Sequence, residues 1–263
     1  MRWIRRHLLA FAALAVLGYL LLPNVVVAVF SFNNPSGRYN YQWPKFSTQA
    51  WQHPCGTPGI CDALGLSLKI GVTASVVATI LGTMVAFALG RHRFRGRATT
   101  NLLIFMPMAT PEVVMGSSLL TLFVMMGVPS GTEAILIAHI MFCLSFVVVA
   151  VKARVASLDP RLEEAAADLG ANPVQTFLRV TLPLTAPGIA AGALLAFSLS
   201  FDDYIITNFQ ASPSSITFPM YVWGASTRGT PVQINVIGTV MFLVALLVVL
   251  GGQLLSRRRQ RAV

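Results

Sequence analysis

The sequence predicts an all-helical polytopic membrane protein with six transmembrane helices. Of its 263 residues, 55% are hydrophobic and only 11% are charged, a composition that excludes an ordinary soluble globule. About 20 apolar residues in a helix cross the roughly 30 Å of hydrocarbon in a bilayer, and polar segments separate several runs of that length. We expect one transmembrane domain over residues 1–263, with spans at about 8–30, 64–89, 102–126, 133–155, 186–209 and 236–255.

The first and third spans differ from plain apolar helices. The first follows three arginines, as a cleaved signal peptide would, but Leu8 to Phe30 exceeds the roughly 7 to 15 apolar residues of such a peptide. No small-x-small cleavage pattern closes it, so we expect an uncleaved helix. In the third span Pro107 and Pro111 each remove a backbone hydrogen bond, and we expect a kink or a split there.

Two polar segments, residues 31–62 and 210–235, are expected to be loops on one side of the membrane. The first is rich in Pro, Gly, Asn and aromatic residues and should hold one short helix near Thr48 to His53. It also contains Cys55 and Cys61, which an oxidising compartment could join. The sequence leaves open whether the two cysteines form a disulfide or remain free thiols.

Residues 159–183 lie between apolar spans but have the signals of ordered helix. Asp159 and Pro160 fit an N-cap and a first helical position, and Gly170 fits the glycine that ends a helix. Asn172, with a glutamine three residues later, predicts a capping box for a second helix. We expect two short helices joined by a turn, the second closed by Leu182 and Pro183.

The first of these helices has an acidic face. Glu164 and Asp168 are like charges one turn apart, with Glu163 beside them, and such pairs cost a few tenths of a kcal/mol. A solvated surface would explain the face without any function. A docking surface for a partner is the alternative.

The same segment carries a specific signature. Glu164-Ala165-Ala166, Gly170, Leu182 and Pro183 fit the EAA-x3-G-x9-I-x-L-P pattern of ABC importer permeases, with Val180 in place of the isoleucine. The resemblance implies a cytoplasmic EAA coupling-helix pair that docks on a separate ATPase subunit. The residues it implies at that contact are Glu163, Glu164, Ala165, Ala166, Asp168, Leu169, Gly170 and Pro183.

The basic residues indicate the topology. Most Arg and Lys residues lie at the two chain ends or in the segments after the second and fourth spans, and the exceptions are Arg38, Lys45, Lys69 and Arg228. The positive-inside rule therefore places both termini and residues 159–183 in the cytoplasm. The net charge of +10 is explained by this topology and by attraction to anionic membrane lipid, so nucleic acid is not an expected partner.

Few ionisable residues lie inside the spans, and these are the candidates for a substrate path because charge is costly in hydrocarbon. Glu112 follows Pro111 in the third span, and Asp202 and Asp203 lie in the fifth beside Tyr204. Carboxylates that face a water-filled cavity can receive a cation. A helix-end or interhelical hydrogen bond for Glu112, and a helix cap near the outer surface for the aspartate pair, are the structural alternatives.

Short stretches across nearly the whole chain narrow the resemblance to the second permease of spermidine/putrescine importers. They are Ser31-Phe32-Asn33, Arg93-Phe94-Arg95-Gly96, Pro111-Glu112-Val113-Val114-Met115, Phe142-Cys143-Leu144 and Ser200-Phe201-Asp202-Asp203. The chain departs from that family in having Glu112 where aspartate is expected and in the cysteine-bearing insert Pro54 to Cys61.

The resemblance implies a MetI-like, binding-protein-dependent importer subunit in the bacterial cytoplasmic (inner) membrane, with polyamines as its solute. The implied partners are a second homologous permease that completes a heterodimer, two ABC ATPase subunits and an extracytoplasmic substrate-binding protein. ATP and Mg would be held by the partner ATPase, because the chain has no GxxxxGK[ST] sequence.

Other function classes lack their sequence features. A secondary transporter should show repeat symmetry or a coupling-ion site, and an enzyme should show a nucleophile with a base or clustered metal ligands. We find neither the features of a secondary transporter nor those of an enzyme in the sequence. We therefore expect no cofactor and no metal in this chain. His139 is expected to be a hydrogen-bonded histidine within the helix bundle. Within transport, another small solute such as an amino-acid-derived cation is the alternative to a polyamine.

Overall fold

The computed structural model describes the backbone of residues 2–261 and the side chains of residues 7–252. Helices dominate this part of the chain, and the one β-bridge found in it joins Asn33 and Phe46. The chain divides into two compact units. Unit 1 comprises Met1–Cys61 with Val222–Val263, and unit 2 comprises Asp62–Tyr221.

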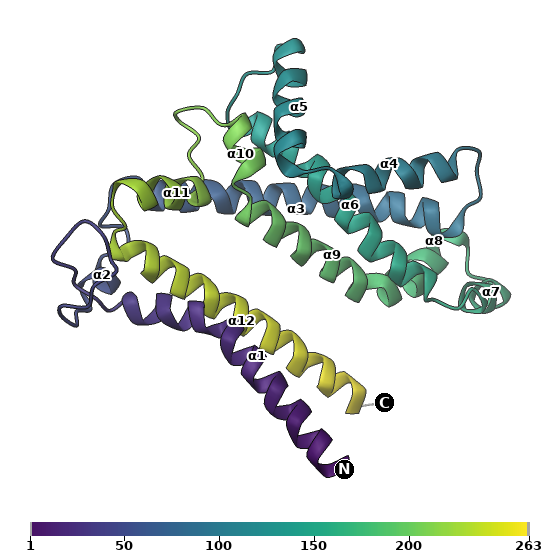
Figure 1. Cartoon of the computed structure of the whole chain (residues 1–263). Coiled ribbons are helices and arrows are strands. Elements are labelled where there is room, and N and C mark those ends of the chain that lie inside the picture. Colours follow the sequence, from purple (N-terminus) through teal and green to yellow (C-terminus); the bar gives the residue numbers. More distant parts are fainter. Residues whose placement is uncertain (1, 262–263) are drawn as a thin grey trace. The chain divides into compact units, whose positions relative to one another are not determined.

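Unit 1 is built on two long antiparallel helices, α1 (Arg2–Phe30) and α12 (Val232–Arg261). They pack side by side, and the ends that carry the chain termini lie together (Figure 1). The short helix α2 (Gln49–Gln52) packs on α12 and confirms the helix expected near Thr48 to His53. Apolar side chains of α1 are largely exposed, as suits a helix that lies in lipid or against a partner.

Unit 2 has its core along α6 (Thr132–Ala156), which packs against α9 (Leu182–Asp202) and lies beside α3 (Ile60–Arg91). Small residues let these helices approach closely, as in other membrane bundles. A Cβ at Gly82 of α3 would lie only 2.7 Å from Cγ1 of Val147 in α6. A side chain at that position would therefore force the two helices apart.

Two helices of unit 2 are broken. α4 (Arg97–Ala109) and α5 (Glu112–Met125) are bent by 109° at Thr110 and Pro111, as the proline predicts. The second break separates α9 from α10 (Ile205–Gln210). α5 and α10 pack together, and a Cβ at Gly116 would come within 2.6 Å of the Phe209 ring. Figure 1 shows α5 and α10 next to each other.

Residues 159–183 contain α7 (Arg161–Asp168), α8 (Pro173–Thr176) and a π-helical turn, η1 (Phe177–Thr181). They lie at the end of unit 2 that also holds the loop between α3 and α4 (Figure 1). The expectation that Leu182 and Pro183 close the second helix is wrong. α8, η1 and α9 follow one another without a break, and Pro183 lies inside this continuous helix directly after the π-helical turn, whose altered hydrogen bonding accommodates the missing N–H.

Five of the described helices are long and apolar enough to cross a membrane, and the bent pair α4–α5 makes a sixth if it is one span. The expected loop at residues 210–235 contains a further helix, α11 (Phe218–Arg228), which the sequence analysis did not predict. The chain is thus a multi-pass membrane protein.

Candidate functional site

α7 ends at the predicted glycine and begins one residue later than predicted, with Pro160 in place of Asp159 as the N-cap. The Asp159 carboxylate accepts a hydrogen bond from the backbone N–H of Arg161 at 3.0 Å. At the other end Gly170 has φ +83, and the N–H groups of Gly170 and Ala171 reach back to carbonyls of the last turn in a Schellman pattern. The capping box predicted for α8 is also present, with Asn172 and Gln175 bonded to each other's backbone at 2.9 and 3.1 Å.

The acidic residues of α7 have different surroundings. Glu164 and Asp168 are exposed, and Leu169 beside them is 89% exposed. Glu163 instead points into unit 2, where its Oε1 accepts a hydrogen bond from Thr181 at 3.0 Å and lies 3.1 Å from Nη2 of Arg91. One face of α7 is therefore open, with acidic and apolar groups, and the other is bonded internally.

Asp203 is buried at the break between α9 and α10. Its carboxylate accepts hydrogen bonds from the N–H groups of Ile206 at 3.3 Å and Thr207 at 2.7 Å, and from the Thr207 hydroxyl at 2.8 Å. These bonds satisfy N–H groups that the first turn of α10 would otherwise leave unpaired. Asp203 is thus a helix cap, although a buried one.

His139 of α6 completes this cluster. The ring is 1% exposed, with Nδ1 2.7 Å from the Ser200 hydroxyl and Nε2 2.9 Å from the Thr207 hydroxyl. Nε2 also lies 3.3 Å from the Asp203 carboxylate. The prediction of a hydrogen-bonded bundle histidine is confirmed. The sequence did not reveal that the ring joins α6 to both sides of the helix break, because its partners lie far along the chain.

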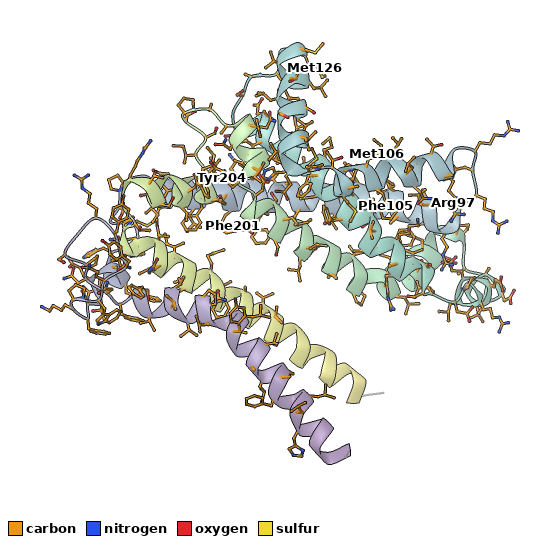
Figure 2. All side chains as sticks on the ribbon, in the orientation of Figure 1. Arg97, Phe105, Met106, Met126, Phe201 and Tyr204 are labelled. Atoms are coloured by element: carbon orange, nitrogen blue, oxygen red, sulfur yellow. A yellow bond between two sulfur atoms is a disulfide. The ribbon has the colours of Figure 1, made fainter. Side chains whose placement is uncertain are left out.

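The other predicted path residues lie at the same two breaks. Glu112 is exposed at the first position of α5, and Asp202 is exposed at the last position of α9. Tyr204 is half-buried between α9 and α10, where Figure 2 labels it close to Phe201. The carboxylate of Glu112 is favoured at a helix N-terminus, whereas Asp202 stands at a C-terminus, where the helix dipole disfavours it. Both open carboxylates therefore mark a point where a helix is interrupted.

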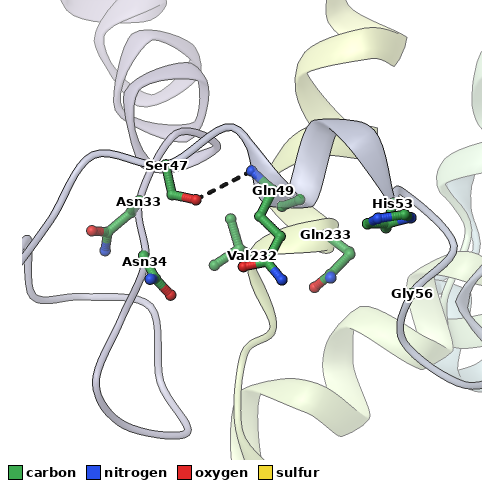
Figure 3. Close-up of a pocket in the computed structure, with 9 residues that line it drawn as sticks. Asn33, Asn34, Ser47, Gln49, His53, Gly56, Val232 and Gln233 are labelled. Atoms are coloured by element: carbon green, nitrogen blue, oxygen red, sulfur yellow. Dashed lines mark hydrogen bonds between the residues drawn. The ribbon is translucent and has the colours of Figure 1, made fainter.

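The first loop of unit 1 is closed by a disulfide between Cys55 and Cys61, which resolves the alternative left open by the sequence. A cavity of about 330 Å³ lies next to this loop, and Figure 3 shows the polar side chains of Gln49, His53 and Gln233 around it. Phe32 stacks between Phe46 and Trp51, and the Tyr39 hydroxyl donates a hydrogen bond to the Thr227 carbonyl at 3.0 Å. The loop is therefore ordered.

No group of three His, Cys, Asp or Glu side chains that could hold a metal ion is found among the described residues.

Residues 78–262 match the family of binding-protein-dependent transport system inner membrane components. The spermidine/putrescine transport system permease protein PotC of Escherichia coli (strain K12) is 35% identical over 247 residues, covering 94% of this chain and 93% of PotC. The putrescine transport system permease protein PotI of the same strain is 38% identical over 230 residues, covering 85% of this chain and 81% of PotI.

Solved structures agree at the level of the fold. A chain of a bacterial ABC transporter involved in the import of the acidic polysaccharide alginate has a TM-score of 0.68 and 19% identity, with 98% of both chains covered. A chain of the MetNI methionine ABC transporter has a TM-score of 0.57 and 15% identity, covering 77% of this chain and 98% of that one. The chain belongs to the binding-protein-dependent transport system inner membrane components, the permease subunits of ABC importers.

Proposed function

We propose that this permease forms half of the translocation path of an ATP-driven importer of polyamines such as spermidine and putrescine. The observation that carries the proposal is the pair of exposed carboxylates, Glu112 and Asp202, at two helix breaks. The names of PotC and PotI, which match most of this chain, support a polyamine as the solute. Polyamines carry several positive charges, so their path needs negative groups.

The two open carboxylates would bind the cation for short periods. At a separation of about 4 Å and an effective dielectric near 20, the attraction between two unit charges is on the order of 4 kcal/mol before desolvation is subtracted. Tyr204, beside the second break, would contribute to the same path. Whether Asp203 itself meets the cation stays a prediction, since its carboxylate is already bonded to Thr207 and lies beside His139.

The open face of α7 would dock on a partner ATPase that holds ATP and Mg. Glu164, Asp168 and Leu169 supply the exposed charges and the apolar group for that contact. ATP binding would draw two ATPase subunits together, displace the segment 159–183 of each permease and switch the path from inward-facing to outward-facing. This mechanism needs two conformations whose populations are biased from both sides of the membrane.

The orientation follows from the charge distribution, with both termini and α7 in the cytoplasm. The paired terminal ends of α1 and α12 support termini on one side of the membrane (Figure 1). The Cys55–Cys61 disulfide supports an oxidising, external location for the first loop. A substrate-binding protein would dock on that outer side, and a second permease would complete the heterodimer.

The test is uptake by proteoliposomes that contain the chain together with the permease, ATPase and binding protein encoded nearest to it. We expect ATP-dependent uptake of labelled putrescine that unlabelled spermidine inhibits and arginine does not. Inhibition by arginine alone would favour an amino-acid-derived cation as solute. Uptake that needs no ATP would refute the proposal.

A further inference from the structure

The carboxylate of Glu163 joins three elements of unit 2 at one oxygen atom. Glu163 lies in the first turn of α7, and its Oε1 is 3.1 Å from Nη2 of Arg91, the last residue of α3. The same oxygen accepts a hydrogen bond at 3.0 Å from Thr181, the last residue of the π-helical turn before α9. Two long membrane helices therefore meet α7 through a single side chain.

The position of each partner favours this contact. An acidic group is stabilised at the N-terminus of a helix and a basic group at the C-terminus, and Glu163 and Arg91 satisfy both conditions. Thr181 is 3% exposed, so the π-helical turn aims its hydroxyl inward. Such turns occur often at functional sites. Nε and Nη2 of Arg91 are buried and have no hydrogen-bond partner among the described residues, so the contact with Glu163 is an ion pair, and removing Glu163 would take away the acidic group beside the guanidinium.

Little apolar packing holds α7 in place. In α7, all of whose residues are described, only Ala166 is buried. A cavity of about 470 Å³ lies between the inner face of α7 and the end of α3, and the edge-to-face rings of Phe87 and Phe177 form part of its wall, with centroids 5.2 Å apart. A loosely packed helix depends on its polar contacts for its position, and here those contacts are made by Glu163.

We infer that Glu163 is a positioning residue that transmits displacement of α7 to α3 and α9, whereas the neighbouring Glu164 is the acidic group open to the ATPase. The inference rests on the proposed function, because it assumes that a partner ATPase moves α7. It divides roles that the EAA signature assigns to one acidic face. The contacts of Glu163 form a contiguous chain from the docking face to two membrane helices, and such chains can carry energetic coupling between distant sites.

The test is a charge exchange in the full reconstituted complex, with uptake per ATP hydrolysed as the readout. Arg91→Glu and Glu163→Arg each place like charges together, and each should lower this ratio by about fivefold or more. The double variant restores opposite charges and should recover most of the ratio. Glu164→Arg combined with Arg91→Glu is the matched control, and it should show no recovery because Glu164 is exposed and does not face Arg91.

A milder variant guards against misfolding. Glu163→Gln keeps an acceptor for Thr181 and removes the charge, so the complex should still co-purify while uptake per ATP hydrolysed falls. An unchanged ratio in an assembled Glu163→Gln complex would overturn the inference. The inference would also be overturned if the double variant Arg91→Glu/Glu163→Arg did not recover uptake per ATP hydrolysed while the parental complex imported polyamine normally. If the parental complex shows no ATP-dependent uptake, the proposed function fails, and this inference fails with it.

Discussion

Asp202 and Asp203 are adjacent in the chain but one is exposed and the other buried, so their asparagine variants form a matched pair. Asp202 is exposed at the end of α9, whereas Asp203 is 9% exposed and accepts hydrogen bonds from two backbone N–H groups and a hydroxyl. Asp203→Asn removes the charge and puts an amide N–H₂ where donors already point. We expect Asp203→Asn to destabilise the permease and Asp202→Asn to leave its stability unchanged.

The size of the effect follows from the contacts. Hydrogen bonds to a charged group contribute about 1.5–3 kcal/mol each, and the asparagine oxygen can keep one of those made by Asp203. A net loss of about 2–3 kcal/mol corresponds to a decrease of roughly 4–12 °C in the melting temperature of a chain of this size. Removing the Asp203 charge also leaves His139 beside a neutral group, which weakens the link between α6 and α10.

Thermal unfolding of the purified complex, measured by intrinsic fluorescence, gives the stability of both variants. Uptake of labelled putrescine over a concentration series separates the apparent KM from the maximal rate. Asp202→Asn should raise the apparent KM at a parental melting temperature, and Asp203→Asn should lower the melting temperature. Equal melting temperatures for the two variants would refute the structural role of Asp203.

Three further predictions concern other parts of the chain. Glu112→Gln should raise the apparent KM for polyamine about tenfold, the effect of a net loss of about 1.4 kcal/mol, while basal ATP hydrolysis stays unchanged; a parental KM would contradict a path role. Gly170→Val should abolish substrate-stimulated ATP hydrolysis, whereas Gly170→Asn should retain it, because asparagine tolerates φ +83 and no atom lies within 4 Å of the added Cβ. Equal activity of the two variants would show that the backbone conformation is unimportant. Cys55→Ser should destabilise the first loop by about 2 kcal/mol and weaken binding of the substrate-binding protein, and reductant should affect only the parental chain.

Local signals predicted the ends of helices because a cap depends on a few consecutive residues. Gly170, and Asn172 with Gln175, needed only their own neighbours to adopt the predicted conformations. Pro183 failed as a stop signal because it directly follows the π-helical turn, and such a local change in hydrogen bonding lets a proline stand inside a membrane helix. No local sequence pattern predicts that turn.

Long-range contacts determine the surroundings of the charged residues. Glu163 and Glu164 are neighbours on a helix and differ in direction by about 100°, so the sequence implies that they face different ways. It does not say which one faces inward, because that depends on Arg91, at the end of another helix. The same holds for Asp202 and Asp203, where the buried carboxylate is the one that lies beside His139, a residue of another helix.

The adjacent pairs Glu163/Glu164 and Asp202/Asp203 share one arrangement. In each pair one acidic group is bonded to helices of unit 2 and its neighbour is exposed. The bonded member, Glu163 or Asp203, holds a short helix against the membrane helices, and the exposed member is free to meet a ligand that changes during the cycle. A carboxylate held by several contacts within the scaffold has fewer free lone pairs and less freedom to move, so it is less suited to bind a moving partner or a passing cation. Under the proposals made above, adjacent acidic residues would separate the two tasks, and exchanging their surroundings should impair both scaffold stability and ligand binding.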